Sequence, residues 1–281
     1  MAQRLIVLLL SLTLAACTGG SVRGKIVFQS NRDGNFDIYS MEADGTGLKQ
    51  LTNSPGYDVS PAWSPDGSHI VFASDRQGNW DIYVMRSDGS DVRKLTSPPG
   101  SNTAPSWAQG GTRIVFISTR DALNGEIYAM DRDGGRPERI THDSTVKDSP
   151  WMTPDGKSLV YTSGSAQGSS VAILNLADRS IVILTPPSGN ASDPRISQDG
   201  SLVLYAEATG SRGELYTVSV AEKTSKCILA GNDFFRTPAW GSSMDEVIYS
   251  RRDGLYLMSI TKGKETRLST KGDSSPDWVK E

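Results

Sequence analysis

The chain has 281 residues, 37% of them hydrophobic, and a formal net charge of −3, as is ordinary for a globular protein. This weak negative charge predicts no nucleic-acid partner and no electrostatic attraction to an anionic membrane surface. Two histidines and two cysteines exclude a disulfide framework, and they do not have the spacing of a zinc site.

The first 16 residues have the pattern of a secretory signal. A positively charged start, MAQR, precedes the apolar run LIVLLLSLTLAA, which is too short to span a bilayer comfortably. The run ends in LAAC, residues 14–17, which resembles a bacterial lipoprotein signal cleaved before Cys17. We therefore expect residues 1–16 to be removed, Cys17 to carry lipid and residues 17–24 to form a tether. A plain signal peptide with an incidental cysteine is the alternative.

Four short motifs then recur in the same order along the rest of the chain. They are an apolar triplet such as IVF, a DIY-like triplet, an LT-like pair and a proline-led run such as PAW. The apolar triplet occupies residues 26–28, 70–72, 114–116, 159–161, 203–205 and 247–249, so the period is 44 or 45 residues. Repeats of about 40–45 residues with four short strands each are typical of propeller blades.

The motifs themselves read as strands and turns. They are rich in Val, Ile, Phe and Tyr and are bounded by turn residues, as in the PDG sequences at 65–67 and 154–156. We predict an all-β, six-bladed β-propeller over residues 25–281, with four antiparallel strands per blade. Because the chain starts at the second strand of a blade, the C-terminal segment SPDWV (275–279) should pair with the N-terminal blade and close the ring.

Large apolar residues fill the third position of the proline-led motif in every copy. We expect them to pack between blades rather than to contact a ligand. They are Trp63, Trp107, Met152, Ile196, Trp240 and Trp278, whereas Trp151 falls one position early.

A resemblance follows from the stretch PAWSPDGSHIVFASDRQGNWDIYVM, residues 61–85. It is similar to the WD40-like repeat in which Pro-Asp replaces Trp-Asp, the repeat of TolB-like propellers. This resemblance implies a lipid-anchored protein of the bacterial cell envelope, on the outer membrane facing the periplasm in a Gram-negative cell. Because blade motifs begin eight residues after Cys17, the α/β domain that precedes the propeller in TolB is expected to be missing.

The loops predict where a partner binds. Strands alternate in direction, so the loops between second and third strands share one face with those that join successive blades. These loops differ most between copies, which is typical of a binding face. The candidate contacts with an envelope protein or peptide segment are Tyr57, Asp58, Trp80, Phe234, Phe235 and Arg236. We expect a monomeric, non-catalytic binding module without a cofactor.

Two other functions stay open. Asn31, Asp33, Asn35 and Asp37 alternate along the chain, and so do Asp75, Asn79 and Asp81. Alternating oxygen ligands suit calcium, although such residues also hydrogen-bond their own turns.

A cation site would be favoured if Asp58, Asp148, Asp193 and Asp273 converge. An enzyme with an active site at the channel mouth is the second alternative, although no G-x-S-x-G motif is present. Cys227 is predicted to be a buried free thiol on a strand.

Overall fold

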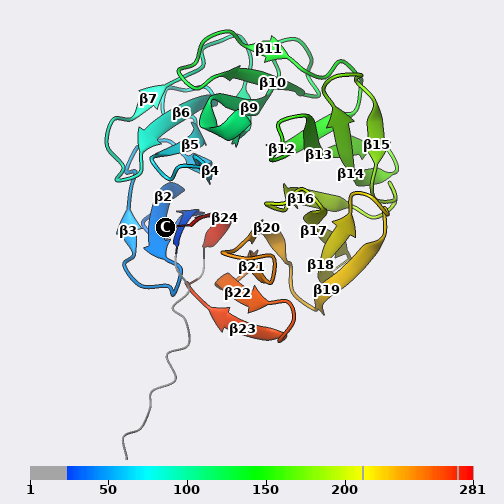
Figure 1. The fold of residues 1–281 in the computed structure, drawn as a ribbon. Coiled ribbons are helices and arrows are strands. Elements are labelled where there is room, and N and C mark those ends of the chain that lie inside the picture. The colour runs from blue at the N-terminus through cyan, green and yellow to red at the C-terminus, as the bar shows by residue number, and fades with distance from the viewer. Residues whose placement is uncertain (1–23, 211, 271, 281) are drawn as a thin grey trace, which may run out of the picture.

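The computed structural model describes residues 24–210, 212–270 and 272–280. The predictions for the signal peptide, the lipidated Cys17 and most of the tether lie outside these residues. Six four-stranded antiparallel sheets radiate from a central channel (Figure 1). The predicted six-bladed propeller is therefore confirmed. No helix within the described ranges is long and apolar enough to cross a membrane.

Each blade is a meander whose first strand lies innermost. The first blade contains β24 (Asp273–Val279), β1 (Lys25–Ser30), β2 (Asp37–Glu42) and β3 (Lys49–Gln50). The second contains β4 (Asp58–Trp63), β5 (His69–Ser74), β6 (Asp81–Arg86) and β7 (Arg93–Lys94). The third contains β8 (Asn102–Ala108), the 3₁₀ turn η1 (Gln109–Gly111), β9 (Arg113–Ser118), β10 (Glu126–Asp131) and β11 (Glu138–Arg139).

The remaining three blades follow the same order. The fourth contains β12 (Val146–Met152), β13 (Ser158–Ser165), β14 (Gly168–Asn175) and β15 (Ile181–Ile183). The fifth contains β16 (Ala191–Ile196), β17 (Leu202–Thr209), β18 (Arg212–Ser219) and β19 (Ser225–Gly231). The sixth contains β20 (Arg236–Trp240), β21 (Glu246–Arg251), β22 (Gly254–Ser259) and β23 (Lys264–Arg267).

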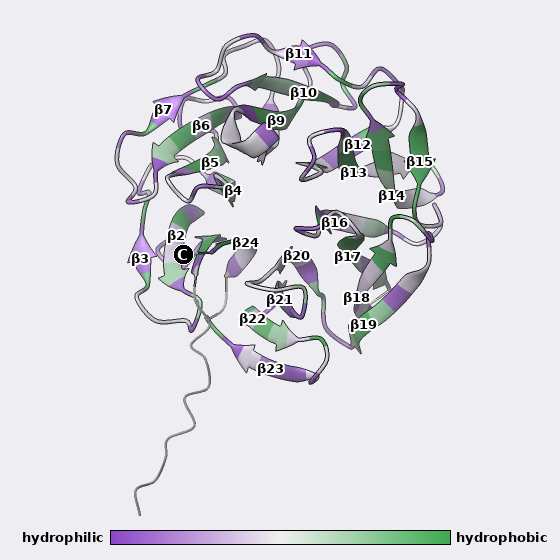
Figure 2. Cartoon of the chain, in the orientation of Figure 1, coloured by the Kyte–Doolittle hydropathy of each residue, from purple (hydrophilic) through white to green (hydrophobic). Residues whose placement is uncertain are grey.

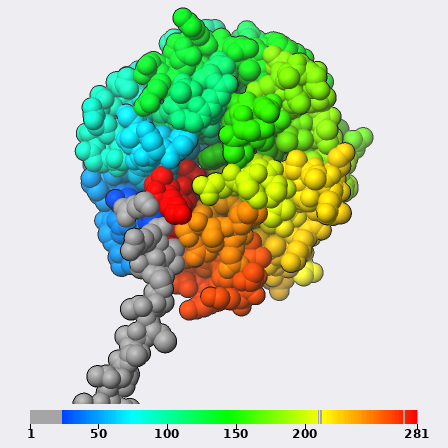
Figure 3. Space-filling model, viewed as in Figure 1, coloured from blue at the N-terminus to red at the C-terminus, as the bar shows by residue number. Residues whose placement is uncertain are grey.

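The C-terminal strand closes the ring as predicted. β24 pairs antiparallel with β1, with Trp278 opposite Ile26 and Val279 opposite Lys25. Figure 3 shows this last segment, in red, wedged between the first and sixth blades. Arg32 adds an ion pair of 2.6 Å to the buried Asp273 of β24. The two ends of the propeller are therefore held together without a covalent bond.

The recurring DIY and LT motifs form one hydrogen-bonded unit. In the first blade the Ile38 N–H donates to Thr52 Oγ1 at 2.8 Å, and the same hydroxyl donates to Asp37 at 3.2 Å. In the second blade, the Ile82 N–H donates to the hydroxyl of Thr96 at 2.9 Å. The threonine ties the short outer strand to the blade, which explains why the two motifs recur together.

The recurring tryptophans pack between blades, as predicted. Trp107 joins the buried cluster of the preceding blade that includes Ala62 and Val71, and its Nε1–H donates to the Ala62 carbonyl at 3.0 Å. Trp240 donates in the same way to the Arg195 carbonyl at 2.9 Å.

Figure 2 shows hydrophobic colour on the middle strands and hydrophilic colour on outer strands such as β3, β7 and β11.

The prediction that Cys227 is buried was wrong. Cys227 lies on β19, the outermost strand of its blade, and is exposed. An outer strand pairs on one edge only, so its side chains are covered less than those of the middle strands. Its Sγ lies 3.5 Å from the Leu229 carbonyl oxygen, and partial burial followed by the nearby Glu214 raises the pKa of the thiol.

Removing β24 should destabilise the whole ring. A chain that ends at Gly272 exposes the edge of β1 and leaves Arg32 without its carboxylate partner. Trp278→Ala alone should lower the free energy of unfolding by about 3 kcal/mol, because a large side chain leaves a cavity. Urea unfolding measures the stability of the truncated chain and of Trp278→Ala. Leu123→Ala, at an exposed position, is the control. A truncated chain that unfolds at the full-length urea midpoint would contradict the closure.

Cys227 should react with a maleimide in the folded protein without denaturant, because its side chain is exposed. The raised pKa keeps the thiolate fraction low near neutral pH, so the rate should be below that of a free cysteine and should increase as the pH rises toward 9. Mass spectrometry of native protein follows the modification. Labelling that requires urea would show that the thiol is covered.

Candidate binding site in the central channel

Each inner strand carries a bulge immediately before its proline. The residue at this point has a positive φ, which is unusual for any residue except glycine. The six φ values lie between 46° and 52°, and the pairing register shifts at the same place in each blade. These six bulge residues are Ser60, Ala104, Ser149, Asp193, Thr237 and Ser275.

The bulge residues meet at the axis and narrow the channel. They line a space of about 40 Å³. One water molecule needs about 10–15 Å³, so the constriction holds a few waters. In three blades the bulge N–H donates to the neighbouring blade: Thr237 to Asp193 at 3.4 Å, Ser275 to Thr237 Oγ1 at 3.0 Å, and Ser60 to Gln29 Oε1 at 2.8 Å. The constriction divides the channel into a mouth on the loop face and a recess on the turn face.

The residue after the proline marks where the repeat is broken. It is small in three blades, where Ala62, Ser106 and Ala239 occupy it. The other three blades place Trp151, Arg195 and Asp277 there. The Arg195 guanidinium lies 4.3 Å from the centre of the Trp151 ring, a cation–π contact. One side of an otherwise repetitive channel is therefore aromatic and charged.

Burial perturbs the two ionisable groups of this side. It lowers the pKa of the Arg195 guanidinium, although Arg195 keeps some contact with channel solvent. Burial also raises the pKa of Asp277 to about 6, against the opposing effects of Arg195 and of the Trp63 and Trp278 N–H groups. The Trp63 N–H donates to Asp277 Oδ2 at 2.7 Å. Asp277 therefore titrates near neutral pH.

The recess below the constriction has a volume of about 210 Å³. It exists where the sequence departs from the repeat, since Ile196 replaces the tryptophan found in four other blades. Three indole rings and two cationic side chains line it together with polar and small residues. The aromatic and charged members are Trp151, Trp240, Trp278, Arg195, Asp277 and Lys280.

On the mouth side, Asp148 and Asp193 are close enough to affect each other. The surrounding channel wall, and secondarily the Asp193 carboxylate, raises the pKa of Asp148, although its side chain meets solvent. Ser149 links the pair: its N–H donates to Asp148 Oδ1 at 2.7 Å, and its hydroxyl lies 3.5 Å from Asp193 Oδ1. The mouth therefore has a negative side.

The predicted mouth residues have unequal exposure. Tyr57 is 47% exposed and packs beside Phe36, with ring centres 6.2 Å apart. Trp80 is partly buried against the core between the second and third blades. Asp58 is fully buried and forms an ion pair of 2.7 Å with Arg76.

The DFFRTP segment, residues 233–238, splits between surface and core. Arg236 is exposed and Phe234 is half-buried between Arg236 and Arg252, at 5.7 and 4.7 Å from its ring centre. Phe235 is only 4% exposed and contacts the Tyr249 ring edge-on at 5.6 Å. The expectation that Phe235 offers surface to a partner is therefore corrected, because this side chain fills the core of the sixth blade.

The four aspartates that would favour a cation site do not converge. Asp58 and Asp273 are buried at the starts of β4 and β24 and are paired with Arg76 and Arg32. Among the described residues, no group of three or more His, Cys, Asp or Glu side chains is arranged to hold a metal ion. The alternating Asn and Asp residues are engaged in the protein. For example, Asn35 donates to the Ser54 and Gly56 carbonyls at 2.8 and 2.6 Å.

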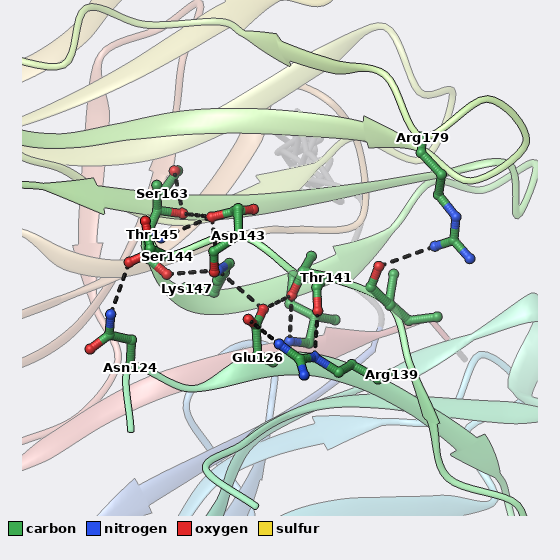
Figure 4. Close-up of polar contacts among 12 residues, drawn as sticks. Asn124, Glu126, Arg139, Thr141, Asp143, Ser144, Thr145, Lys147, Ser163 and Arg179 are labelled. Carbon is green, nitrogen blue, oxygen red and sulfur yellow. Dashed lines mark hydrogen bonds and ion pairs between the residues drawn. The ribbon is translucent and has the colours of Figure 1, made fainter. Parts of the chain in front are cut away.

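A buried ionic cluster joins the third and fourth blades (Figure 4). Lys147 Nζ, whose side chain is fully buried, lies 3.1 Å from Glu126 Oε2 and 2.9 Å from Asp143 Oδ1. It also donates to the Asp143 and Thr145 carbonyls, and Arg139 binds Glu126 at 2.7 Å. Because these charged groups are paired with one another, we interpret the cluster as a structural contact between the third and fourth blades and not as a binding site.

Sequence reasoning found the mouth face but missed the strongest features of the channel. Arg195 and Asp277 lie inside the proline-led motifs PRI and PDW, where alignment of the six copies shows that the other blades place small residues or Trp151. The sequence shows that Trp151 falls one position before the usual tryptophan. Its stacking on Arg195, however, brings two blades together and is seen only in the folded ring. The sequence signal that could have found these residues is the change of residue type after the proline, from small in three copies to Trp, Arg or Asp in the other three.

The geometry defines a closed six-bladed propeller with a constricted channel, an acidic side at its mouth and a cationic aromatic recess. The TolB beta propeller domain model matches residues 21–96 and 77–244, so the chain belongs to this family.

Among curated relatives, the Tol-Pal system protein TolB of Xylella fastidiosa (strain Temecula1 / ATCC 700964) is 31% identical over 109 residues. These residues are 38% of this chain and 25% of that protein. The corresponding protein of Xanthomonas oryzae pv. oryzae (strain PXO99A) is 33% identical over 110 residues, again 38% and 25%. The alignment thus spans a quarter of the length of these relatives.

Solved structures share the fold. TolB from Acinetobacter baumannii superposes with a TM-score of 0.80 at 23% identity, over 92% of this chain and 67% of that chain. An oligogalacturonate lyase in complex with manganese superposes with a TM-score of 0.62 at 13% identity, over 88% and 74%. At these identities the likeness establishes the architecture alone.

Replacing Asp277 by Asn should change how stability depends on pH. The pKa of Asp277 is about 6 in the folded chain against an ordinary 3.8, so the native state holds the proton more tightly. Its contribution to stability is complete below about pH 4 and is lost as the pH rises through 6, by about 3 kcal/mol. Asn has no such titration.

The free energy of unfolding of the Asn variant, relative to wild type, should therefore increase between pH 4 and 7. Urea unfolding at both values measures the difference. Asp44→Asn is the control, since hydrogen bonds from Thr46 lower the pKa of Asp44 and its titration falls below this window. An Asp277→Asn difference that is equal at both pH values would contradict the assignment.

Proposed function

We propose that this protein is a lipid-anchored, non-catalytic propeller of the bacterial cell envelope that captures a protein or peptide segment at its channel mouth. The observation that carries the proposal is the asymmetry of the mouth. Three successive blades, the fourth to the sixth, place Asp148, Asp193 and the exposed Arg236 on one half of the mouth, above a constriction that holds a few waters. A charged rim of this kind orients a partner, and the constriction stops it from passing through.

Exposed apolar side chains complete this surface. Tyr57 is 47%, Val146 53% and Leu123 97% exposed, and all three belong to the loops or strand ends of the mouth face. A capped channel with such a rim suits an inserted loop or chain end, for which aromatic side chains supply apolar area. The name of the relatives, Tol-Pal system protein TolB, supports a role in such a system.

The proposal differs from the sequence expectation in its anchors. Phe235 and Asp58 serve the core, so Tyr57, Phe234 and Arg236 are the contacts from the predicted set that remain available. Trp80 supports the adjacent loop, since the Asn102 N–H donates to its carbonyl at 2.8 Å. Calcium binding and catalysis remain alternatives, and the fold shared with a lyase favours neither.

Site-specific photo-crosslinking tests the binding face with matched positions. A benzophenone amino acid at Tyr57, 47% exposed, should give a discrete adduct in native membranes. The same probe at Leu48, 49% exposed in a turn on the opposite face, should give none. Combined Asp148→Asn and Arg236→Ala changes should reduce the Tyr57 adduct at least about tenfold. An adduct from Leu48 but not from Tyr57 would reverse the face assignment.

Fatty-acid labelling tests the anchor separately. Cells supplied with a clickable fatty acid should label the wild-type protein and should not label Cys17→Ser, because the thiol of Cys17 is the proposed acceptor. Cys227→Ser is the matched control and should keep its label. Undiminished labelling of Cys17→Ser would refute lipidation at this residue while leaving the mouth proposal intact.

A further inference from the structure

The recess on the turn face of the channel contains a cation whose hydrogen-bonding capacity is largely unused. A guanidinium has five N–H donors. For Arg195 the structure shows one hydrogen bond, from Nη1 to the Pro194 carbonyl at 3.2 Å. Its Nε is buried and has no partner within the described chain. An unpaired donor in a buried place is costly. Nε is closed to solvent, so an acceptor from outside would bind the outer nitrogens of this partly exposed side chain.

Arg195 is held ready for such an acceptor. Its side chain rests on the Trp151 ring at 4.3 Å, and its backbone carbonyl accepts the Trp240 Nε1–H at 2.9 Å. Both the head group and the strand that carries it are therefore fixed. A planar, preorganised guanidinium matches the two oxygens of a carboxylate.

The other charges of the recess agree with an anion. Lys280 adds a second positive group to the lining, and Asp277 is the negative one. Asp277 Oδ2 is already occupied by the Trp63 N–H at 2.7 Å, which turns it toward the neighbouring blade. Asp277 forms no ion pair of 4.0 Å or less with Arg195 in the described residues. The recess lining thus has two cationic side chains and one carboxylate, while Asp193 and Asp148, toward the mouth, also act on Arg195.

The walls of the recess indicate which kind of ligand would carry the carboxylate. The indole rings of Trp151, Trp240 and Trp278 line a volume of about 210 Å³, many times the space of one water molecule. We propose that this recess binds the carboxylate of a small organic acid, with Arg195 as its bidentate partner and the three indoles around its apolar body. The carboxylate can belong to a free acid or to the C-terminus of a peptide. This proposal does not depend on partner capture at the mouth.

Calorimetry and tryptophan fluorescence with three probes test the proposal on the whole propeller. Benzoate should bind saturably and change the fluorescence, whereas benzamide, which lacks the charge, and benzylammonium, which reverses it, should bind at least about tenfold more weakly. Equal binding of benzamide, or tighter binding of benzylammonium, would overturn the proposal.

Variants assign the effect to the guanidinium. Arg195→Met should weaken benzoate binding at least about tenfold, and Arg195→Lys, which keeps the charge without the fork, should weaken it less. Arg179→Met is the matched control, since Arg179 also donates to one carbonyl, that of Ile140, far from the channel, and it should bind benzoate normally. Thermal melting checks folding, and Arg195→Lys keeps the test valid if the Met variant does not fold. Unchanged affinity in Arg195→Lys and Arg195→Met would refute the site.

A peptide pair distinguishes the two sources of the carboxylate. N-acetyl-Ala-Phe with a free C-terminus is compared with its amide. Binding of benzoate and of the peptide acid, but not of the amide, would assign the recess to peptide C-termini. Binding of benzoate alone would assign it to free small acids.

Discussion

The channel depends on one backbone constraint: the residue before each inner-strand proline has a positive φ, in the left-handed region. It bends the strand at the axis, where six strands converge, and in the first, second and sixth blades its backbone N–H donates to the neighbouring blade. Such a conformation costs free energy in any residue with a Cβ, so it persists only because the closed ring holds it. Closure by β24 on β1 therefore maintains the geometry of the centre as well as the rim.

With the bulges in place, the residue after each proline determines the shape and charge of the channel wall. Small residues there leave a plain, narrow passage, as in the second, third and sixth blades. Trp151, Arg195 and Asp277 make the other side aromatic and charged, and burial raises the pKa of Asp277, so the ionised form of this carboxylate opposes folding. The recess follows from these three residues, whereas the acidic mouth follows from Asp148 and Asp193, before the prolines of two of the same strands.

The sequence predicted the architecture well because its information is local and repeated. The apolar triplet and the proline-led strand each appear six times, the triplet at a period of 44 or 45 residues, and the hydrogen-bonded DIY and LT pair appears in five blades. The closing strand follows from where the first copy begins. The individual side chains were less predictable. Phe235 and Phe234 are adjacent in one loop, yet only the packing of the sixth blade buries one and leaves the other partly open. Cys227 was assigned to the correct outer strand but wrongly expected to be buried, because this strand is paired on one edge only. Arg195 and Asp277 line the same recess although 82 positions separate them in the sequence, and no local pattern predicts that proximity.

The central claim is that the departures from the repeat serve binding and not folding. The most direct measurement compares the wild type with a chain in which the inner strands are made regular, by Trp151→Ser, Asp193→Ser, Arg195→Ala and Asp277→Ala together. The account predicts that this variant unfolds cooperatively with a free energy of unfolding no lower than that of the wild type, because buried charges are removed, while crosslinking at the mouth and benzoate binding are both lost. A regularised propeller that keeps both activities, or one that fails to fold, would contradict it.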